Sequence, residues 1–185
     1  MSRRRTAGAG VMACLWDSGG VAFEIPSDLN PDLVALAWMI GSWEGSGKSS
    51  YPGTEDLDFG QRIDFSHNGG SYLHYLSQTY EVGPDGQPVR PLSMETGFWR
   101  PQRDASIEVV MTNPEGWVEV WYGNIQGAKI ELRTDAVVRT ASAPDYTAGH
   151  RLYGNVESDL LWTFDRAADG QPIQSYQWGR LRRIS

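Results

Sequence analysis

One run of seven residues, Gly41-Ser42-Trp43-Glu44-Gly45-Ser46-Gly47, constrains the fold of this chain more than any other. Glycines at alternate positions of a strand let another backbone approach closely or let the strand bend, and the single Trp among them is a large apolar plug. Apolar residues at helical spacing precede the run, from Leu33 to Ile40, and Asn30-Pro31 supplies a cap and a first helical position. This order predicts a short helix joined directly to the first strand of a closed barrel.

The same run contains a sequence similar to a phosphate-binding loop, Gly45-Ser46-Gly47-Lys48-Ser49. The P-loop pattern also needs a glycine five positions before the second glycine, where this chain has Ser42, and it needs a helix after the loop. Here a helix precedes a strand. We therefore do not predict a nucleotide site.

Composition excludes several classes of protein. With 16 basic and 23 acidic residues, the net charge of −7 disfavours nucleic-acid binding. The single cysteine, Cys14, excludes an internal disulfide framework and a cysteine-rich metal site. No apolar run reaches the length of about 18 residues that a membrane-spanning helix requires. Scattered Asp and Glu residues are interpreted as solvated outer faces, and no group of side chains has metal-ligand spacing.

The N-terminal region is separated from the predicted domain. Arg3 to Arg5 followed by an apolar stretch resembles an export signal, but the stretch is short and lacks a good cleavage site. We expect residues 1–28 to be a flexible tail of a cytoplasmic protein and residues 29–185 to form one domain.

Alternating apolar residues and turn signals predict an all-β domain of about ten strands. Asn68-Gly69 is a hairpin signal, and Pro114 lies in a strong turn tetrad. Short turns without crossover helices favour an antiparallel up-and-down β-barrel with the short N-terminal helix as a lid. A barrel of this size leaves an interior for a ligand. After a first strand towards Tyr51, the expected strands cover residues 58–66, 71–82, 92–100, 107–112, 117–122, 129–134, 136–140, 147–156, 160–165 and 173–184.

Motifs spread over residues 33–183 resemble the nitrobindin family of haem-binding β-barrels. Gly-x-Trp alone would be weak evidence, because lipocalins begin their first strand the same way, but the complete series is specific. The matching motifs are Gly41-x-Trp43-x-Gly45-x-Gly47, Phe65-Ser66-His67-x-Gly69, Glu95-x-Gly97-Phe98-x-Arg100, Glu108-Val109-Val110, Pro114-x-Gly116 with Val118-Glu119, and Gly170-Gln171-Pro172-Ile173-Gln174.

The resemblance implies a ten-stranded barrel shaped like a fatty-acid-binding protein. Family members hold ferric haem through one histidine on the last strand, bind nitric oxide and are credited with isomerising peroxynitrite to nitrate. This chain departs from the family at that histidine, because Pro172-Ile173-Gln174 is followed by Ser175 and Tyr176. Ser93 also stands where many members have a pocket histidine.

Tyr176 has three interpretations that the sequence leaves open. Its phenolate could bind ferric haem, which requires a pKa far below the usual value of about 10 and help from nearby cations. Its phenol could donate a hydrogen bond to a polar ligand head, or its ring could simply fill the space of haem. Arg180 shares its face by strand parity but lies about 13 Å away, so any cation that assists must come from a neighbouring strand.

The remaining candidate residues are weaker. Lys48 and Thr54 lie where family members approach haem, with an exposed strand end as the alternative. The histidines, His67, His74 and His150, are interpreted as structural or solvated rather than as metal ligands.

The leading hypothesis is a nitrobindin-like barrel that has lost the axial histidine and binds a small hydrophobic or amphipathic molecule. No haem cofactor, metal, nucleic acid or membrane partner is expected, and the sequence does not distinguish a monomer from a dimer. The alternative is a haem-dependent peroxynitrite isomerase or nitric-oxide-binding protein that uses Tyr176 or another residue as iron ligand.

Overall fold

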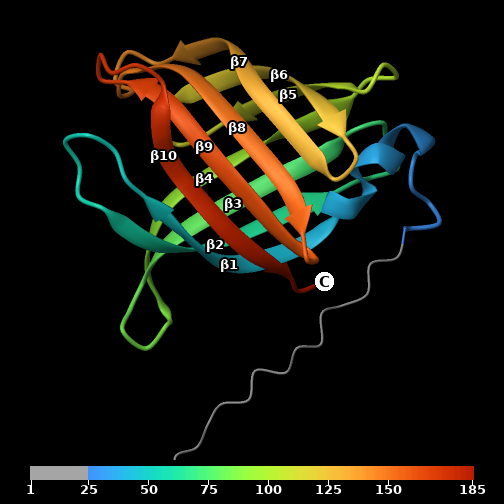
Figure 1. Cartoon of the computed structure of the whole chain (residues 1–185), viewed down its shortest axis with the longest axis horizontal. Coiled ribbons are helices and arrows are strands. Elements are labelled where there is room, and N and C mark those ends of the chain that lie inside the picture. Colours follow the sequence, from blue (N-terminus) through green and yellow to red (C-terminus); the bar gives the residue numbers. More distant parts are fainter. Residues whose placement is uncertain (1–24) are drawn as a thin grey trace, which may run out of the picture.

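Ten antiparallel strands close into one barrel in the computed structural model, which describes residues 25–185 (Figure 1). Each strand pairs with its neighbours in the chain, and β1 pairs with β10 to complete the ring. The predicted all-β up-and-down barrel is therefore confirmed. The strands are β1 Gly41–Ser49, β2 Leu57–Ser66, β3 Leu73–Val82, β4 Pro88–Pro101, β5 Ser106–Thr112, β6 Trp117–Gln126, β7 Lys129–Arg139, β8 Tyr146–Val156, β9 Asp159–Ala168 and β10 Gln174–Arg183.

The expected break between residues 129–134 and 136–140 is a β-bulge inside a single strand, β7. Val120 pairs with Ala136 and Trp121 pairs with Thr134, so Asp135 is the extra residue on β7. A bulge leaves one residue unpaired and increases the local twist without ending the strand. The alternating pattern is interrupted there, which is why the sequence predicted two strands.

A 3₁₀-helix, η1 (Pro31–Met39), covers one end of the barrel (Figure 1). The side chain of Asn30 accepts a hydrogen bond from the Asp32 amide at 3.0 Å and caps the first turn. Leu33, Leu36 and Met39 are fully buried. Their spacing of three suits the three residues per turn of this helix type, so a single stripe faces the barrel. The predicted helical lid is confirmed, with a tighter winding.

Trp43 joins this lid to the barrel. Its side chain is fully buried, and its Nε1 donates to the Met39 carbonyl at 2.8 Å. Two positions later on the same face, a Cβ on Gly45 would lie 2.2 Å from the carbonyl oxygen of Arg180. A side chain at Gly45 would therefore force β10 away from β1. The alternate glycines let the first and last strands approach closely enough to close the ring.

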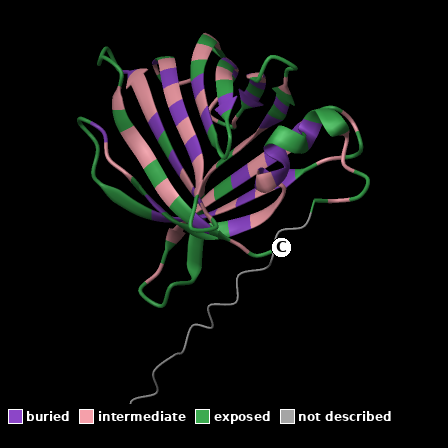
Figure 2. Ribbon diagram, turned by 45° about the vertical axis from the view of Figure 1, so that its right-hand side comes forward, coloured by how far each residue is buried: buried purple, intermediate pink, exposed green. Residues whose placement is uncertain are grey.

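The barrel interior has two different halves. Burial alternates along the strands because successive side chains point to opposite faces (Figure 2). Under η1 the interior is packed with apolar side chains, and towards the opposite end, where β10 begins, polar groups enter it. The apolar half includes Leu33, Leu36, Met39, Trp43, Ile63, Phe65, Leu73, Trp99, Ile107 and Val109.

The predicted N-terminal tail falls mostly outside the described residues, because residues 1–24 are not among them. Within residues 25–185, no helix is long and apolar enough to span a membrane.

Replacing Trp43 with Ala is expected to lower the free energy of unfolding by about 3–5 kcal/mol, because the buried indole would leave a cavity between lid and barrel. Urea-induced unfolding measures the change. Trp178→Ala is the matched control, since Trp178 lies on the outer face with 38% of its surface exposed. Equal effects of the two substitutions would contradict the assignment of Trp43 as the plug.

Candidate functional site

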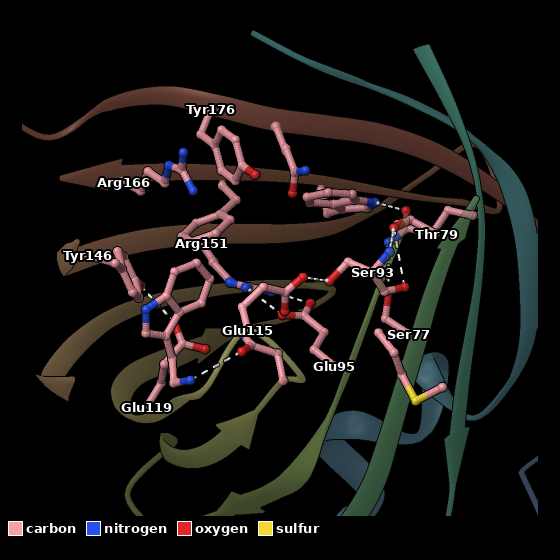
Figure 3. Close-up of a pocket in the computed structure, with 17 residues that line it drawn as sticks. Ser77, Thr79, Ser93, Glu95, Glu115, Glu119, Tyr146, Arg151, Arg166 and Tyr176 are labelled. Atoms are coloured by element: carbon pink, nitrogen blue, oxygen red, sulfur yellow. Dashed lines mark hydrogen bonds and ion pairs between the residues drawn. The ribbon is translucent and has the colours of Figure 1, made fainter. Parts of the chain in front are cut away.

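A cavity of about 120 Å³ lies in the half of the barrel opposite η1 (Figure 3). The late part of β9, the early part of β10 and the turn between β5 and β6 meet there, because antiparallel strands bring these ends to the same rim. Its walls combine aromatic rings with charged groups. The lining includes Gln61, Ser77, Thr79, Ser93, Glu95, Glu115, Trp117, Glu119, Tyr146, Arg151, Trp162, Phe164, Arg166, Tyr176 and Gln177.

A buried ion pair forms the floor of the cavity. Two nitrogens of Arg151, on β8, donate to the two carboxylate oxygens of Glu95, on β4, at 2.7 and 2.8 Å. Tyr75 donates its hydroxyl to the same carboxylate at 2.7 Å, and Arg151 also donates to the Tyr153 hydroxyl at 3.2 Å. Such additional hydrogen bonds offset part of the cost of burying a charge pair.

The two charges of the floor stabilise each other. Burial raises the pKa of the Glu95 carboxyl, but the charge and hydrogen bonds of Arg151 lower it more, so that the net pKa lies below the ordinary value. Burial tends to lower the pKa of Arg151, and the charge of Glu95 reverses this effect. The Arg151 guanidinium also lies 4.1 Å from the ring centre of Phe164 and 5.2 Å from that of Trp121. Aromatic faces thus hold the arginine in place from the side.

Glu119 forms a second polar element in the wall. Only 2% of its surface is exposed, and its Oε1 accepts the Tyr146 hydroxyl at 2.7 Å. Burial is the main reason that the pKa of Glu119 is raised, and the nearby charge of Glu95 adds to it, while Arg151 acts in the opposite direction. A proton is therefore held more tightly at Glu119 than at an ordinary glutamate.

Ser93 lies at the mouth of this cavity and faces the turn between β5 and β6. Its hydroxyl donates to Oε1 of Glu115 at 2.6 Å, and its amide donates to the Thr79 hydroxyl at 3.1 Å. The second oxygen of Glu115, Oε2, is buried and has no hydrogen-bond partner within residues 25–185. Ser93 thus lines the cavity and donates a hydrogen bond to a carboxylate.

Tyr176 lines the cavity because of a β-bulge. Ser175 pairs with Asp165 and Gln177 pairs with Phe164, so Tyr176 is the extra residue of β10. Its ring makes edge contacts with Tyr51 and Phe164, with ring centres 5.7 and 5.5 Å apart.

The cation beside Tyr176 is Arg166, from the neighbouring strand β9 (Figure 3). Its guanidinium lies 3.6 Å from the ring centre of Tyr176 and 4.5 Å from that of Tyr51. The expectation that Arg180 shares the face of Tyr176 was wrong, because the bulge shifts the alternation by one residue. Arg180 is on the outer face, where it pairs with Asp159 at 2.5 Å.

Comparison with known proteins identifies the family. The family model described as "THAP4-like, heme-binding beta-barrel domain" matches residues 32–183. The chain belongs to this family. The resemblance to nitrobindin is thereby confirmed.

Individual relatives in this family carry two kinds of name. A "Ferric nitrobindin-like protein" from Cutibacterium acnes is 60% identical, over 87% of this chain and 98% of the relative. A "Peroxynitrite isomerase" from a Nocardioides species is 46% identical, again over 87% of this chain and 98% of the relative. The crystal structure of Rv2717c from M. tuberculosis has the same fold, with a TM-score of 0.77 and 32% identity over 85% of this chain and 99% of that one.

The other candidate residues suggested by the family resemblance do not meet at the cavity. Lys48 is exposed and pairs with Asp58 at 3.1 Å, and the hydroxyl of Thr54 donates to the Tyr51 carbonyl at 2.8 Å. Of the predicted candidates, Tyr176 and Ser93 line the cavity and Lys48, Thr54 and His67 do not.

The chain has three histidines, and none of them lines the cavity. His67 lies in a hairpin turn and its Nδ1 accepts the Gly69 amide at 3.4 Å. His74 bonds the Thr96 hydroxyl, and His150 lies between Glu131 and Asp165 at 3.0 and 3.3 Å. Each histidine thus has polar partners away from the interior.

Sequence reasoning missed most of the polar groups of the site. Glu95 and Glu119 were interpreted with the other scattered Asp and Glu residues as solvated outer faces, and no role was predicted for Arg151, whereas all three line the cavity. A signal was present around Glu119, since Val118 and Val120 flank it in strict alternation. That alternation defines two faces but does not say which one is inside.

Glu95→Gln is expected to lower the free energy of unfolding by about 3–5 kcal/mol, because Arg151 would keep a buried charge without its counter-charge. Adding Arg151→Met should recover part of this loss. Chemical unfolding measures both variants. Glu108→Gln is the control, since Glu108 pairs with Arg100 at 3.0 Å on the outer face. A loss no larger than that of the control would contradict the role of the buried pair.

Glu119→Gln is expected to stabilise the fold increasingly as the pH rises. The folded-state pKa of Glu119 is raised. Above the unfolded pKa of about 4.3, the folded wild type therefore binds more protons than the unfolded chain, and its stability falls with pH until the folded pKa is passed. The neutral amide of the variant still offers an oxygen that accepts the Tyr146 hydroxyl. Because this amide does not titrate, the variant does not lose stability at this position as the pH rises.

Urea unfolding of wild type and Glu119→Gln at about pH 4 and about pH 8 measures the difference in stability. Glu55→Gln, at an exposed position in the segment before β2, is the control and should show no such trend. A difference between Glu119→Gln and wild type that stays constant with pH would contradict the assignment.

Proposed function

We propose that this chain is a nitrobindin-like barrel that binds a small molecule and does not bind haem. The observation that carries the proposal is the size of the interior: about 120 Å³ remains between the floor and the mouth. An apolar protein cavity of about 150 Å³ accommodates benzene, and pockets for drug-sized ligands measure about 300–1,000 Å³. Haem is much larger than benzene, so the residues present do not fit it.

The side chains around the cavity support the same proposal. Haem iron is held by His, Cys, Met or Tyr, and the family's histidine position carries Tyr176. A tyrosine ligand needs cations close to its oxygen to favour the phenolate, whereas Arg166 lies over the ring face. The ion pair between Glu95 and Arg151 also crosses the interior that a porphyrin would need.

The ligand that we propose is smaller and more polar than the sequence suggested. A hydrophobic or amphipathic molecule was expected, but two arginines and three glutamates line the cavity. Burying an apolar ligand against these groups would remove their solvation without replacing it. The cytoplasmic location and a domain covering residues 29–185 remain parts of the proposal.

The alternative function is a haem-dependent peroxynitrite isomerase. One observation favours it: the Nocardioides relative, at 46% identity, carries that name. In this case Tyr176 would have to serve as iron ligand, and the interior would have to open.

Haemin titration of the purified protein separates the two functions. We expect no stoichiometric Soret band for wild type, because the space left in the interior is too small for haem. Tyr176→His alone should not create tight haem binding, since Arg166 and the floor remain. Apomyoglobin is the positive control and Tyr176→Phe is the matched variant.

Two outcomes would overturn this proposal. A stoichiometric Soret band in wild type that disappears in Tyr176→Phe would establish the alternative. Tight haem binding by Tyr176→His would show that only the iron ligand was lost and that the interior had remained large enough.

A further inference from the structure

We propose that the cavity binds a small zwitterion of amino-acid size, with its carboxylate on Arg166 and its ammonium group on Glu115. This inference rests on the proposed function, since it requires a barrel without haem. It adds the chemical class of the ligand and the two residues that recognise its charges.

Arg166 is an inward-facing arginine without an acidic partner. Arg151 binds Glu95 through two nitrogens, but Arg166 forms no ion pair within residues 25–185, and its buried Nε has no hydrogen-bond partner there. The rings of Tyr51 and Tyr176 fix the plane of its guanidinium. A guanidinium held in one plane presents parallel N–H donors that match the two oxygens of a carboxylate.

Glu115 offers the opposite charge in the same cavity. Ser93 satisfies only Oε1, and the buried Oε2 lacks a donor among the described residues. A buried acceptor without a partner destabilises the fold, and the effect is larger when the acceptor is charged. A ligand with an N–H donor at this end would remove that cost.

The charges of the cavity favour a zwitterion over a simple ion. Glu95 and Arg151 neutralise each other, and Glu119 already accepts the Tyr146 hydroxyl. One positive and one negative group, Arg166 and Glu115, are then left for the ligand. An anion or a cation alone would satisfy one of them and leave the other desolvated, whereas a dipolar molecule satisfies both.

The size of the cavity limits the zwitterion to a compact molecule. Because about 120 Å³ is slightly less than the cavity of about 150 Å³ that holds benzene, we expect about six non-hydrogen atoms, as in glycine or alanine. The rings of Trp117 and Phe164 are part of the wall, and the volume leaves no room for a long side chain.

Nitrogen-15 NMR of the full chain tests the proposal with glycine and alanine as probes. The indole N–H signals of Trp117 and Trp162, both in the cavity wall, should shift in a saturable way. The signal of Trp43, buried beside η1, should stay in place. Acetate and methylammonium, which carry one charge each, should bind at least about tenfold more weakly than alanine.

Variants test the two recognition residues separately. Glu115→Gln and Arg166→Gln should each weaken alanine binding about tenfold or more, the effect of losing a hydrogen bond to a charged group. Arg100→Gln and Glu108→Gln, which alter an ion pair on the outer face, should leave affinity unchanged. Thermal unfolding confirms that each variant folds, and Arg166→Lys replaces Arg166→Gln if that variant does not fold.

Several outcomes would overturn the inference. Acetate binding as tightly as alanine and unaffected by Glu115→Gln would show a simple anion site, and the converse result with methylammonium would show a cation site. Absence of any shift at the solubility limit of the amino acids would show that the cavity does not take this class. If haemin also fails to bind, the haem-free proposal stands without the zwitterion, whereas a Soret band overturns the proposed function itself.

Discussion

The ion pair between Glu95 and Arg151 joins β4 to β8 through the middle of the barrel. Tyr75 and Tyr153 add hydrogen bonds to the pair and aromatic rings flank the guanidinium, and these contacts offset part of the cost of burying the two charges. The pair therefore acts as a partition. On the side of η1 the interior is apolar and filled, and on the other side it is polar and partly hollow, so the partition sets the depth and the charge of the space in which a ligand can bind.

Family membership explains the barrel but not which side chains point into it or which ligand they bind. The glycine and tryptophan motif around Trp43 closes the ring and attaches the lid, and these features depend on backbone approach. The ligand depends on the inward side chains, which can change while the strands keep their order. Bulges matter in the same way, because the extra residue at Tyr176 turns that side chain inward and moves Arg180 outside. A single inserted position thus redistributes the charges of two faces.

Much of the fold could be predicted from the sequence, because turn signals and alternation are local. The strands, their antiparallel order and the lid all followed from such patterns. The site was harder to predict. Val118 is 44% exposed and Val120 shares its outer face, whereas Glu119 between them is 2% exposed. At this point of β6 the outer face carries two valines and the inner face carries a glutamate, so the usual assignment of polar residues to the solvent gives the opposite orientation.

The sequence by itself determined the closed antiparallel barrel and the lid. Only the tertiary structure decided which charges meet inside. Glu95 and Arg151 are 56 residues apart, and Arg166 reaches Tyr51 across the strands that close the ring. Such contacts depend on the register of neighbouring strands and on bulges, which shift a side chain from one face to the other. The volume of the cavity follows from the sum of these contacts.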